Sequence, residues 1–243
     1  MQKFGLIGYP LEHSFSPGYF RRKFEALKIT DAEYHSYPIA IIEDLEDLLS
    51  SNEFCGLNVT IPYKEKVLPF LNELDEIAFE VGAVNCIKIY KGKRVGYNTD
   101  VFGFEVSLLE FLRGDLNKKA LVLGSGGAAK AVHYVLRKLN IPYLEVSRNS
   151  ERGIGYEDIN PRILDEYTLI INTTPLGMYP KTNECPNLPY VELNESHFLY
   201  DLIYNPKKTL FLARGFQQNC NIINGERMLQ LQAEKSWEIW QNV

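Results

Sequence analysis

A glycine-rich turn between a short apolar run and a helix-forming segment constrains the fold of this chain most strongly. The run ALVL at residues 120–123 is fully apolar, which is typical of a buried parallel strand. It leads into GSGGAAK at 124–130, and helix-forming residues continue to Leu139. The order of strand, turn and helix, with the spacing G-x-G-x-x-A, matches the dinucleotide-binding fingerprint. The alternative is a tight turn that holds no ligand.

Each small residue of the turn has a physical role in that fingerprint. Gly124 permits the tight turn, and Gly126 lets backbone N–H groups approach a pyrophosphate. Ala129 is small enough for helix and strand to pack closely, while the positive end of the helix dipole attracts phosphate. The residues predicted to bind the nucleotide are Gly124, Ser125, Gly126, Gly127, Ala128 and Ala129.

The end of the next predicted strand, at 143–146, indicates which nucleotide the turn binds. A carboxylate there would hold the ribose 2′-OH of NAD, whereas basic residues would accept the 2′-phosphate of NADP. Glu145 lies inside the strand, too deep to reach the ribose. Polar residues that can donate to a phosphate follow it: Ser147, Arg148, Asn149 and Arg152. NADP is therefore favoured, and the alternative is a solvated loop.

Strand-like and helix-like segments alternate along the chain, which predicts an α/β fold on largely parallel sheets. Strands are expected at 3–8, 33–38, 58–64, 86–90, 94–97, 120–123, 143–146, 169–172, 198–202 and 220–223. Helices are expected at 17–27, 42–50, 66–70, 73–81, 101–113, after the glycine turn to 139, and after 225. The strands at 86–90 and 94–97 should form a hairpin.

Composition narrows the class of protein. The chain has 243 residues, of which 45% are hydrophobic and 23% charged, as in ordinary soluble proteins. A net charge of −5 argues against nucleic acid as a partner, and no apolar run approaches the ~18 residues of a membrane helix. The 4 cysteines lie far apart, without the paired spacing of a zinc or redox site. We expect reduced thiols in a cytoplasmic protein.

Polar residues also gather at strand ends in the first hundred residues, at 13–17, 58–64, 82–85 and 98–100. Ligands of α/β proteins bind where the carboxyl ends of strands meet. Hydroxyls, amides, Lys64 and Asp100 suit a small polyhydroxylated substrate with a carboxylate, and the lysine and aspartate would form an acid/base pair. The alternatives are helix caps at Ser14 and Ser16, an Asx turn at 98–100 and a surface lysine.

Eight motifs, in this order, resemble those of the shikimate dehydrogenase family over nearly the whole chain. They are HSFSP at 13–17, NVTIPYK at 58–64, GAVN at 82–85, NTD at 98–100, GSGGAA at 124–129, NTTPLGM at 172–178, DLIYNP at 201–206 and MLQLQA at 228–233. The resemblance implies NADPH-dependent reduction of 3-dehydroshikimate to shikimate, a step toward the aromatic amino acids.

The resemblance also implies roles for individual residues. Lys64 and Asp100 would be the catalytic pair. Substrate would be bound by Ser14, Ser16, Thr60, Asn85, Tyr204 and Gln232, with the two serines and the tyrosine at its carboxylate. Beside the glycine-rich turn and the residues after 146, the cofactor would be bound by Thr173, Leu202 and Gly225. No metal is implied. Polar alternation over 58–64 would then arise because one face of that strand lines the substrate cleft.

Two domains are expected on the same grounds. Residues 1–100 would form an α/β substrate-binding catalytic domain, and 101–224 a Rossmann-like, doubly wound NADP-binding domain. The last helix, 225–243, would return to the first domain, because Gln232 must reach the substrate. The protein would be a monomer or a homodimer.

Departures from the family pattern keep alternatives open. Phe20 stands where the family usually has histidine, Cys86 replaces a frequent threonine, and Ser-Arg-Asn at 147–149 replaces Asn-Arg-Thr. One alternative is an enzyme of the same fold that also oxidises quinate with NAD. Another is a catalytically silent, nucleotide-sensing regulator, although both Lys64 and Asp100 are present.

Overall fold

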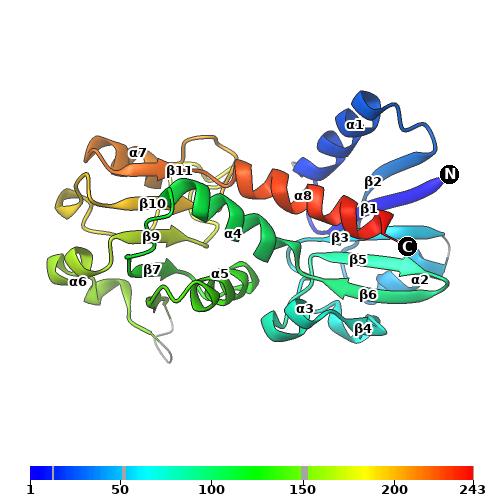
Figure 1. The fold of residues 1–243 in the computed structure, drawn as a ribbon, viewed down its shortest axis with the longest axis horizontal. Coiled ribbons are helices and arrows are strands. Elements are labelled where there is room, and N and C mark those ends of the chain that lie inside the picture. The colour runs from blue at the N-terminus through cyan, green and yellow to red at the C-terminus, as the bar shows by residue number, and fades with distance from the viewer. Residues whose placement is uncertain (13, 51–52, 149–152, 243) are drawn as a thin grey trace. The chain divides into compact units, whose positions relative to one another are not determined.

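The computed structural model describes residues 1–12, 14–50, 53–148 and 153–242. The chain forms two compact units, the first made of Met1–Thr99 and Ala233–Val243 and the second of Asp100–Gln232. Each unit is built around one β-sheet (Figure 1), and the predicted α/β class is confirmed. Within the described residues no helix is long and apolar enough to cross a membrane.

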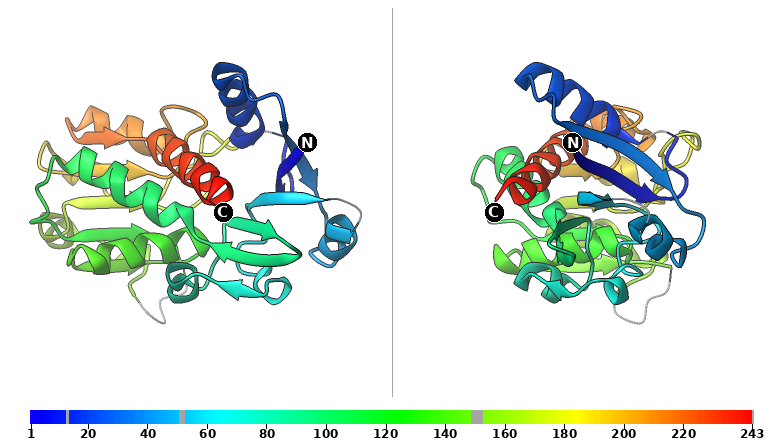
Figure 2. Two further views of the ribbon diagram at one scale, coloured as in Figure 1. Left: turned by 45° about the vertical axis from the view of Figure 1, so that its right-hand side comes forward. Right: turned by 90° about the vertical axis from the view of Figure 1, so that its right-hand side faces the viewer.

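The sheet of the first unit is mixed. In the described chain its strands are β1 (Gln2–Gly8), β2 (Ala32–Pro38), β3 (Phe54–Val59), β4 (Glu73–Leu74), β5 (Cys86–Tyr90) and β6 (Lys93–Tyr97), in the order β2-β1-β3-β5-β6-β4. β1 pairs in parallel with β2 and β3, whereas β5 is antiparallel to β3 and β6. The pair β5–β6 is the predicted hairpin (Figure 2), turned at Lys91 and Gly92 with positive φ angles.

Helices cover both faces of this sheet, and each face has its own apolar core. The helical segments of the first unit are α1 (Phe15–Leu27), α2 (Asp44–Ser50), η1 (Leu68–Phe70) and α3 (Glu76–Val81). Side chains of β1 alternate between the faces, because successive residues of a strand point to opposite sides. Phe4 packs with Phe20 of α1, and Ile7 packs with Leu45 of α2.

The last helix, α8 (Glu226–Gln241), is divided between the units. Residues 226–232 belong to the second unit and 233–241 to the first. In the first unit its Trp240 lies directly on Gly56, where a Cβ atom would overlap the indole ring. The same indole stacks on Phe4 with ring centroids 4.8 Å apart, and its N–H donates to the carbonyl oxygen of Ile87 at 2.9 Å. These contacts anchor the second half of α8 on the first sheet.

The sheet of the second unit is parallel throughout. Its described strands are β7 (Ala120–Leu123), β8 (Tyr143–Val146), β9 (Leu169–Asn172), β10 (Phe198–Asp201) and β11 (Asn221–Ile223), in the order β11-β10-β9-β7-β8. Fully apolar β7 and nearly apolar β9 are buried along their whole length, as the sequence predicts. The strand order reverses between β7 and β9, which is the point where open α/β sheets bind ligands.

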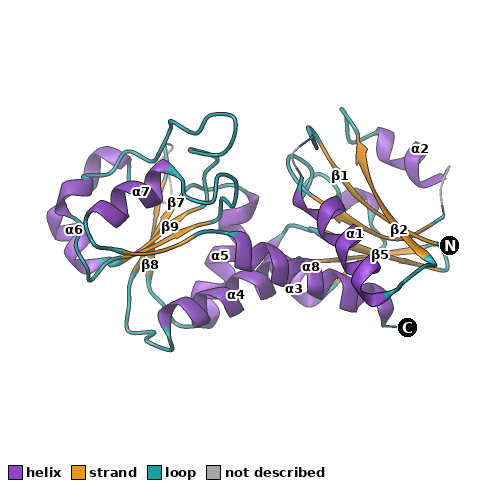
Figure 3. Ribbon diagram, turned by 90° about the horizontal axis from the view of Figure 1, so that it is seen from above, coloured by secondary structure: helices purple, strands orange, loops and turns teal. Residues whose placement is uncertain are grey.

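Helices lie on both sides of the parallel sheet, as Figure 3 shows from above, with α4 (Thr99–Leu112) and α5 (Gly127–Lys138) on one side. On the other side lie α6 (Pro161–Glu166) and α7 (Leu210–Gln217). Two short 3₁₀ segments, η3 (Tyr156–Asp158) and η4 (Tyr190–Glu192), complete the described elements. This is the doubly wound arrangement expected for the second domain.

Several predicted element boundaries are wrong. The strand expected at 58–64 ends at Val59, because the chain turns at 60–63, where the N–H of Tyr63 donates to the carbonyl oxygen of Thr60 at 2.9 Å. The helix expected at 73–81 begins only at Glu76, where Asp75 accepts a capping bond from the N–H of Ala78 at 2.9 Å. Glu73 and Leu74 instead form β4, which pairs with β6. The sequence analysis missed α6 and α7.

Asp201, at the end of β10, gives the second unit a pH-dependent stability. Its fully buried carboxylate accepts hydrogen bonds from Asn172 at 3.0 Å, the N–H of Ile203 at 3.0 Å and Thr209 at 2.6 Å. Burial raises the pKa of Asp201 to about 6, and these three donors offset only part of that effect. The folded chain thus holds this proton more tightly than the unfolded chain, whose aspartates have a pKa of about 4. The stabilisation is complete below about pH 4 and is lost as the pH rises through about 6.

Replacing Asp201 by asparagine should remove this dependence. Between about pH 4 and about pH 7 we expect the parent to lose roughly 3 kcal/mol of unfolding free energy relative to Asp201→Asn. Urea unfolding of both proteins across this range measures the difference. Parallel pH profiles of the two proteins would contradict the prediction.

Candidate functional site

The carboxyl ends of β1 and β3 lie side by side in the first unit, and Thr60 stands at this edge. The two strands pair in parallel, and the N–H of Thr60 donates to the carbonyl oxygen of Ile7 at 2.9 Å. Gly8 makes this approach possible, because a Cβ atom there would overlap the methyl group of Thr60. Thr60 is therefore held at the strand end where α/β proteins bind ligands.

The turn after Thr60 brings Lys64 next to the loop that carries Asn85. Tyr63 fixes the turn, since its buried hydroxyl donates to the carbonyl oxygen of Ile39 at 2.7 Å. The carbonyl oxygen of Lys64 accepts the N–H of Val84 at 2.8 Å, one residue before Asn85. The side chain of Lys64 is half-buried rather than fully exposed. The structure thus places two predicted substrate-binding segments together.

Asn58 does not face a ligand, although the alternation over 58–64 predicts that it does. Only 3% of the residue is exposed. Its carbonyl oxygen accepts from the Tyr34 hydroxyl at 2.8 Å, and its amide donates to the Ser236 hydroxyl at 2.9 Å and the carbonyl oxygen of Asn85 at 3.2 Å. The prediction is wrong for Asn58 because its polar partners are supplied by the protein interior.

Asn85 is buried and holds the first residue of α4. Its side-chain oxygen accepts the N–H of Thr99 at 2.6 Å, and its amide nitrogen lies 3.0 Å from the Thr99 hydroxyl. This bond satisfies one of the N–H groups that a helix start leaves without a partner. Asn98 donates to the carbonyl oxygen of Ala83 at 2.8 Å, so its amide ties the motif at 98–100 to the neighbouring loop.

Ser14 and Ser16 stand at the start of α1. Ser14 occupies the N-cap position with an extended backbone, but its side chain makes no capping hydrogen bond. Ser16, in the first turn, is only 7% exposed. Helix capping therefore does not account for the hydroxyl of Ser14.

The glycine-rich turn has the geometry that the fingerprint requires. Gly124 has a φ of 109°, in the region that favours glycine, and a Cβ there would lie 2.7 Å from the Thr173 hydroxyl oxygen. Gly126 is the N-cap residue of α5, so no side chain caps this helix. A Cβ atom added to Gly126 would meet no other atom within 4 Å. Ser125 is exposed beside it, whereas Ala129 is buried against the sheet. The N–H groups of Gly127 and Ala128 begin the helix, as phosphate binding demands.

The carboxyl ends of β9, β10 and β11 meet near this turn. Thr173 donates through its hydroxyl to the carbonyl oxygen of Leu123 at 2.7 Å. The N–H of Leu202 donates to the carbonyl oxygen of Asn172, the residue before Thr173, at 3.0 Å. Gly225 lies against Leu202, since a Cβ on the glycine would overlap the leucine carbonyl. The structure therefore brings together Gly124, Thr173, Leu202 and Gly225.

The end of β8 carries Ser147 and Arg148. Ser147 is buried and its N–H donates to the carbonyl oxygen of Ile154 at 3.1 Å, whereas Arg148 is exposed. Burial raises the pKa of Tyr156, and the nearby positive charge of Arg148 opposes the shift. Asn149 and Arg152, also predicted to bind the cofactor, lie outside the residues that the structure describes.

Glu145 is directed away from the end of β8. Its carboxylate lies 3.6 Å from the Nε2 atom of His133 on α5. Burial, aided by the charge of Arg137, lowers the pKa of His133 to about 4, so the imidazole is neutral near pH 7 and this approach is not a salt bridge. Among the described residues, the strand end carries Ser147 and Arg148, which suit a phosphate better than a carboxylate would.

Asp100 and Gln232 share one side of the second unit. Asp100 lies in the first turn of α4 and is 7% exposed, and Gly103 is three residues further on the same helix face. A Cβ on Gly103 would lie 2.5 Å from the carbonyl oxygen of Met228 and 3.2 Å from the Cβ of Gln232. The absence of a side chain at Gly103 thus lets α8 approach α4. Tyr204, also predicted to bind substrate, is half-buried three residues after β10.

Fold and site together define a class of protein. A parallel sheet carries a glycine turn and helix N-terminus at its reversal point, and a second α/β unit presents polar groups at its strand ends. These features are those of a dinucleotide-binding α/β protein with a separate ligand-binding unit.

Comparison with known proteins gives the family. Residues 6–87 match the model of the shikimate dehydrogenase substrate binding domain. Shikimate dehydrogenase (NADP(+)) of Methanococcus maripaludis is 38% identical over 254 residues, which cover 97% of this chain and 90% of that protein. The chain therefore belongs to the shikimate dehydrogenase family.

Solved structures agree with that assignment. The structure of shikimate 5-dehydrogenase from Thermus thermophilus in complex with NADP(H) and shikimate matches with a TM-score of 0.87 and 29% identity, covering 100% of this chain and 94% of that one. Quinate dehydrogenase from Corynebacterium glutamicum in complex with NAD matches with a TM-score of 0.88 and 26% identity, over 100% and 94% of the two chains. The fold alone therefore does not separate the two substrates.

Some residues that shape the site were missed by the sequence analysis. Gly103 was one, although a glycine inside a helical segment, three residues after Asp100, is a signal for close approach of another element. Tyr34 and Ser236 were others, and each of them contacts Asn58. Their only sequence signal is a polar residue on an otherwise apolar face.

Gly103→Ala tests whether the close approach of α8 matters. The added methyl group must displace Met228 and Gln232, so we expect a loss of roughly 1–3 kcal/mol of unfolding free energy. We also expect a higher KM for shikimate, because Gln232, which is predicted to bind substrate, is moved. Urea unfolding and steady-state kinetics measure the two effects.

Gly18→Ala in α1 is the matched control. An added Cβ there meets only the Nη1 atom of Arg22, at 3.5 Å, so the change should be neutral or slightly stabilising. If Gly103→Ala proved as harmless as Gly18→Ala, the contact would not constrain α8.

Proposed function

We propose that this protein reversibly reduces 3-dehydroshikimate to shikimate with NADPH, within the biosynthesis of aromatic compounds. The observation that carries the proposal is the 38% identity, across 97% of the chain, to a protein named shikimate dehydrogenase (NADP(+)). The presence of Lys64 and Asp100 argues against the alternative of a catalytically silent regulator. Oligomeric state and cytoplasmic location remain predictions.

The residues of the second unit fit a dinucleotide. The open space beside Gly126 and the start of α5 without a side-chain cap suit the pyrophosphate. We propose that residues 124–129, Thr173, Leu202 and Gly225 hold the cofactor, with Ser147 and Arg148 at the 2′-phosphate. Asn149 and Arg152 complete the proposed phosphate site. When bound, NADPH supplies the hydride.

Substrate is proposed to bind along the strand ends of the first unit and the neighbouring helix starts. Ser14 and Ser16 would donate to the carboxylate, a charge-assisted contact, with Tyr204 at the same end. Thr60, Asn85 and Gln232 would hold ring hydroxyls. The proximity of the turn with Lys64 to the loop with Asn85 supports this arrangement.

Lys64 and Asp100 are proposed to perform the chemistry. Reduction of a ketone builds negative charge on its oxygen, and a positioned donor must stabilise that charge. The ammonium group of Lys64 can neutralise the forming alkoxide and give it a proton. Asp100 can orient the ammonium and accept a hydrogen bond from the adjacent hydroxyl. In the reverse direction the same pair takes up the proton.

One assay tests the proposal. Absorbance of the reduced nicotinamide is followed with shikimate or quinate, each paired with NADP or NAD. We expect turnover to be fastest with shikimate and NADP. Because a quinate dehydrogenase has almost the same fold, faster turnover of quinate with NAD would replace the proposal by that alternative.

Lys64→Ala should lower kcat far more than it raises KM, because the ammonium acts mainly on the transition-state oxygen. Loss of a general acid or base typically costs ~10²–10⁴-fold in rate. Lys66→Ala removes a nearby exposed lysine and is the control, with kinetics expected to match the parent. A Lys64→Ala variant with the parent's kcat and weak shikimate binding would limit Lys64 to binding.

Arg148→Ala should erase most of the preference for NADP over NAD, since the guanidinium is proposed to bind the 2′-phosphate. The measurement is kcat/KM with each cofactor at fixed ionic strength, because salt screens such contacts. Arg162→Ala removes another exposed arginine of the second unit and should keep the parent's ratio. An unchanged ratio in Arg148→Ala would move the phosphate site elsewhere.

A further inference from the structure

A chain of buried hydrogen bonds crosses the first unit and ends at two of the proposed substrate residues. It runs from Tyr34 through Asn58 and Ser236 to Thr99 and Asn85, and Ser16 interacts with the Tyr34 hydroxyl at its first end. All six residues are at most 8% exposed, and Ser236 is fully buried. The chain therefore links a residue proposed to bind the carboxylate with one proposed to bind a ring hydroxyl.

Burial fixes the direction of the first bonds. It raises the pKa of Tyr34 well above its ordinary value, and the hydrogen bond from Ser16 opposes this only in part. The Tyr34 hydroxyl therefore stays protonated and donates a hydrogen bond to the side-chain oxygen of Asn58 at 2.8 Å. The position of the Tyr34 hydroxyl is set by its hydrogen bond to Asn58. The orientation of the Ser16 hydroxyl in turn depends on the position of the Tyr34 hydroxyl.

The amide of Asn58 is held by three partners. Its nitrogen donates to the carbonyl oxygen of Asn85 at 3.2 Å and to the Ser236 hydroxyl at 2.9 Å, while its oxygen accepts from Tyr34. A backbone carbonyl can only accept, so the nitrogen must point toward Asn85. Asn58 thus has a single satisfied orientation.

Ser236, on α8, joins this amide to the start of α4. Its hydroxyl lies 3.2 Å from that of Thr99, whose N–H donates to the side-chain oxygen of Asn85 at 2.6 Å. Asn58 thus donates to the backbone carbonyl of Asn85, which also accepts the N–H of Val59, and Thr99 binds the side chain of Asn85. Both Asn58 and Thr99 contact Ser236.

We propose that Tyr34, Asn58 and Ser236 are positioning residues that set the placement of Ser16 relative to Asn85, and thereby match the site to the separation between carboxylate and hydroxyl on the substrate. The proposal rests on the proposed function. None of the three residues is proposed to touch substrate or cofactor. They act through hydrogen bonds that permit only one arrangement of the Ser16 and Asn85 side chains.

The competing explanation is that Tyr34, Asn58 and Ser236 only stabilise the fold. The second unit contains a buried serine–tyrosine pair that can serve as a control for this explanation. Ser107 and Tyr200 are fully buried, and their hydroxyls lie 2.5 Å apart. This pair satisfies buried polar groups without contacting a proposed site residue. Ser107→Ala and Tyr200→Phe are therefore the controls for Ser236→Ala and Tyr34→Phe.

The experiment measures steady-state kinetics and calorimetric binding of shikimate for all four variants, together with their melting temperatures. Loss of one hydrogen bond corresponds to roughly three- to tenfold in affinity. We expect Tyr34→Phe and Ser236→Ala to raise KM and Kd for shikimate by about that factor, with KM for NADP unchanged. Ser107→Ala and Tyr200→Phe should lower the melting temperature comparably but keep shikimate binding within about twofold of the parent.

Double variants separate the network from independent effects. Tyr34→Phe and Ser236→Ala both act through the Asn58 amide, so their combination should raise KM by less than the product of the single effects. In a Ser16→Ala background, Tyr34→Phe should add little. Tyr34→Phe keeps the buried aromatic ring, so its kinetics distinguish a positioning role from a structural one even if Ser236→Ala does not fold.

Two outcomes overturn the inference in distinguishable ways. If the parent turns over shikimate and neither Tyr34→Phe nor Ser236→Ala shifts KM beyond the controls, the network has only a structural role and the proposed function stands. If the parent neither binds nor oxidises shikimate, the proposed function fails and the inference fails with it.

Discussion

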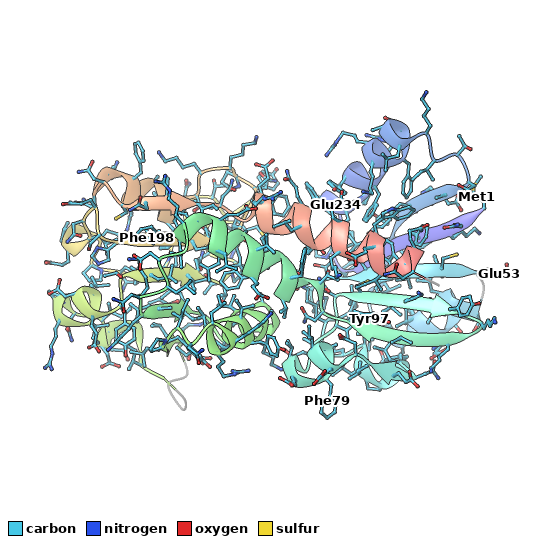
Figure 4. The ribbon with its side chains drawn as sticks, in the orientation of Figure 1. Met1, Glu53, Phe79, Tyr97, Phe198 and Glu234 are labelled. Atoms are coloured by element: carbon cyan, nitrogen blue, oxygen red, sulfur yellow. The ribbon has the colours of Figure 1, made fainter. Side chains whose placement is uncertain are left out.

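The seating of Trp240 on Gly56 is the contact on which the organisation of the first unit depends. Ser236 precedes Trp240 by one helical turn, and Asn58 follows Gly56 by two residues, so each pair shares a face of its element. One turn of four residues rises roughly 6 Å along a helix, and two residues span about 6.6 Å of a strand. When the indole lies on Gly56, the Ser236 hydroxyl therefore reaches Asn58, at 2.9 Å. Two residues before Ser236, Glu234, which is labelled in Figure 4, binds Tyr19 and Lys23 of α1.

Two residues that the sequence analysis takes as departures from the family pattern, Phe20 and Cys86, lie near this same contact. Phe20 is fully buried and stacks on Tyr34 with centroids 4.4 Å apart, so an apolar ring covers the phenol that donates to Asn58. Cys86 lies beneath Ser236 and Trp240, and burial raises the pKa of its thiol to about 12, which keeps it neutral. Both substitutions surround the polar chain with apolar or uncharged groups. In such surroundings a hydrogen bond is stronger and a missing partner costs more.

Local physics explains which parts of the structure could be predicted from the sequence. The strands at 120–123 and 169–172 are short apolar runs buried on both faces, and the glycine turn combines them with a helix signal, so these predictions are confirmed. The prediction of a strand over 58–64 failed because alternation does not show that the chain turns at 60–63. Alternation also cannot separate a solvated Asn58 from one whose partner, Ser236, lies 178 positions away. The short helices α6 and α7 were not predicted, because their starts are marked by the capping side chains of Asn160 and Thr209 more than by hydrophobic periodicity.

The start of α4 shows how the buried chain can influence chemistry that it does not touch. Thr99 belongs to the first unit and Asp100, its neighbour in sequence, to the second. The side chain of Asn85 accepts the N–H of Thr99, so the first residue of the helix is set by a loop of the first unit. Helix geometry then fixes Asp100 one residue on and Gly103 one turn on, where α8 passes with Gln232. Ser236, whose hydroxyl lies 3.2 Å from that of Thr99, therefore contacts the residue that precedes Asp100 in the sequence. The residue before the proposed acid/base group is thus held by hydrogen bonds with uncharged groups of the first unit.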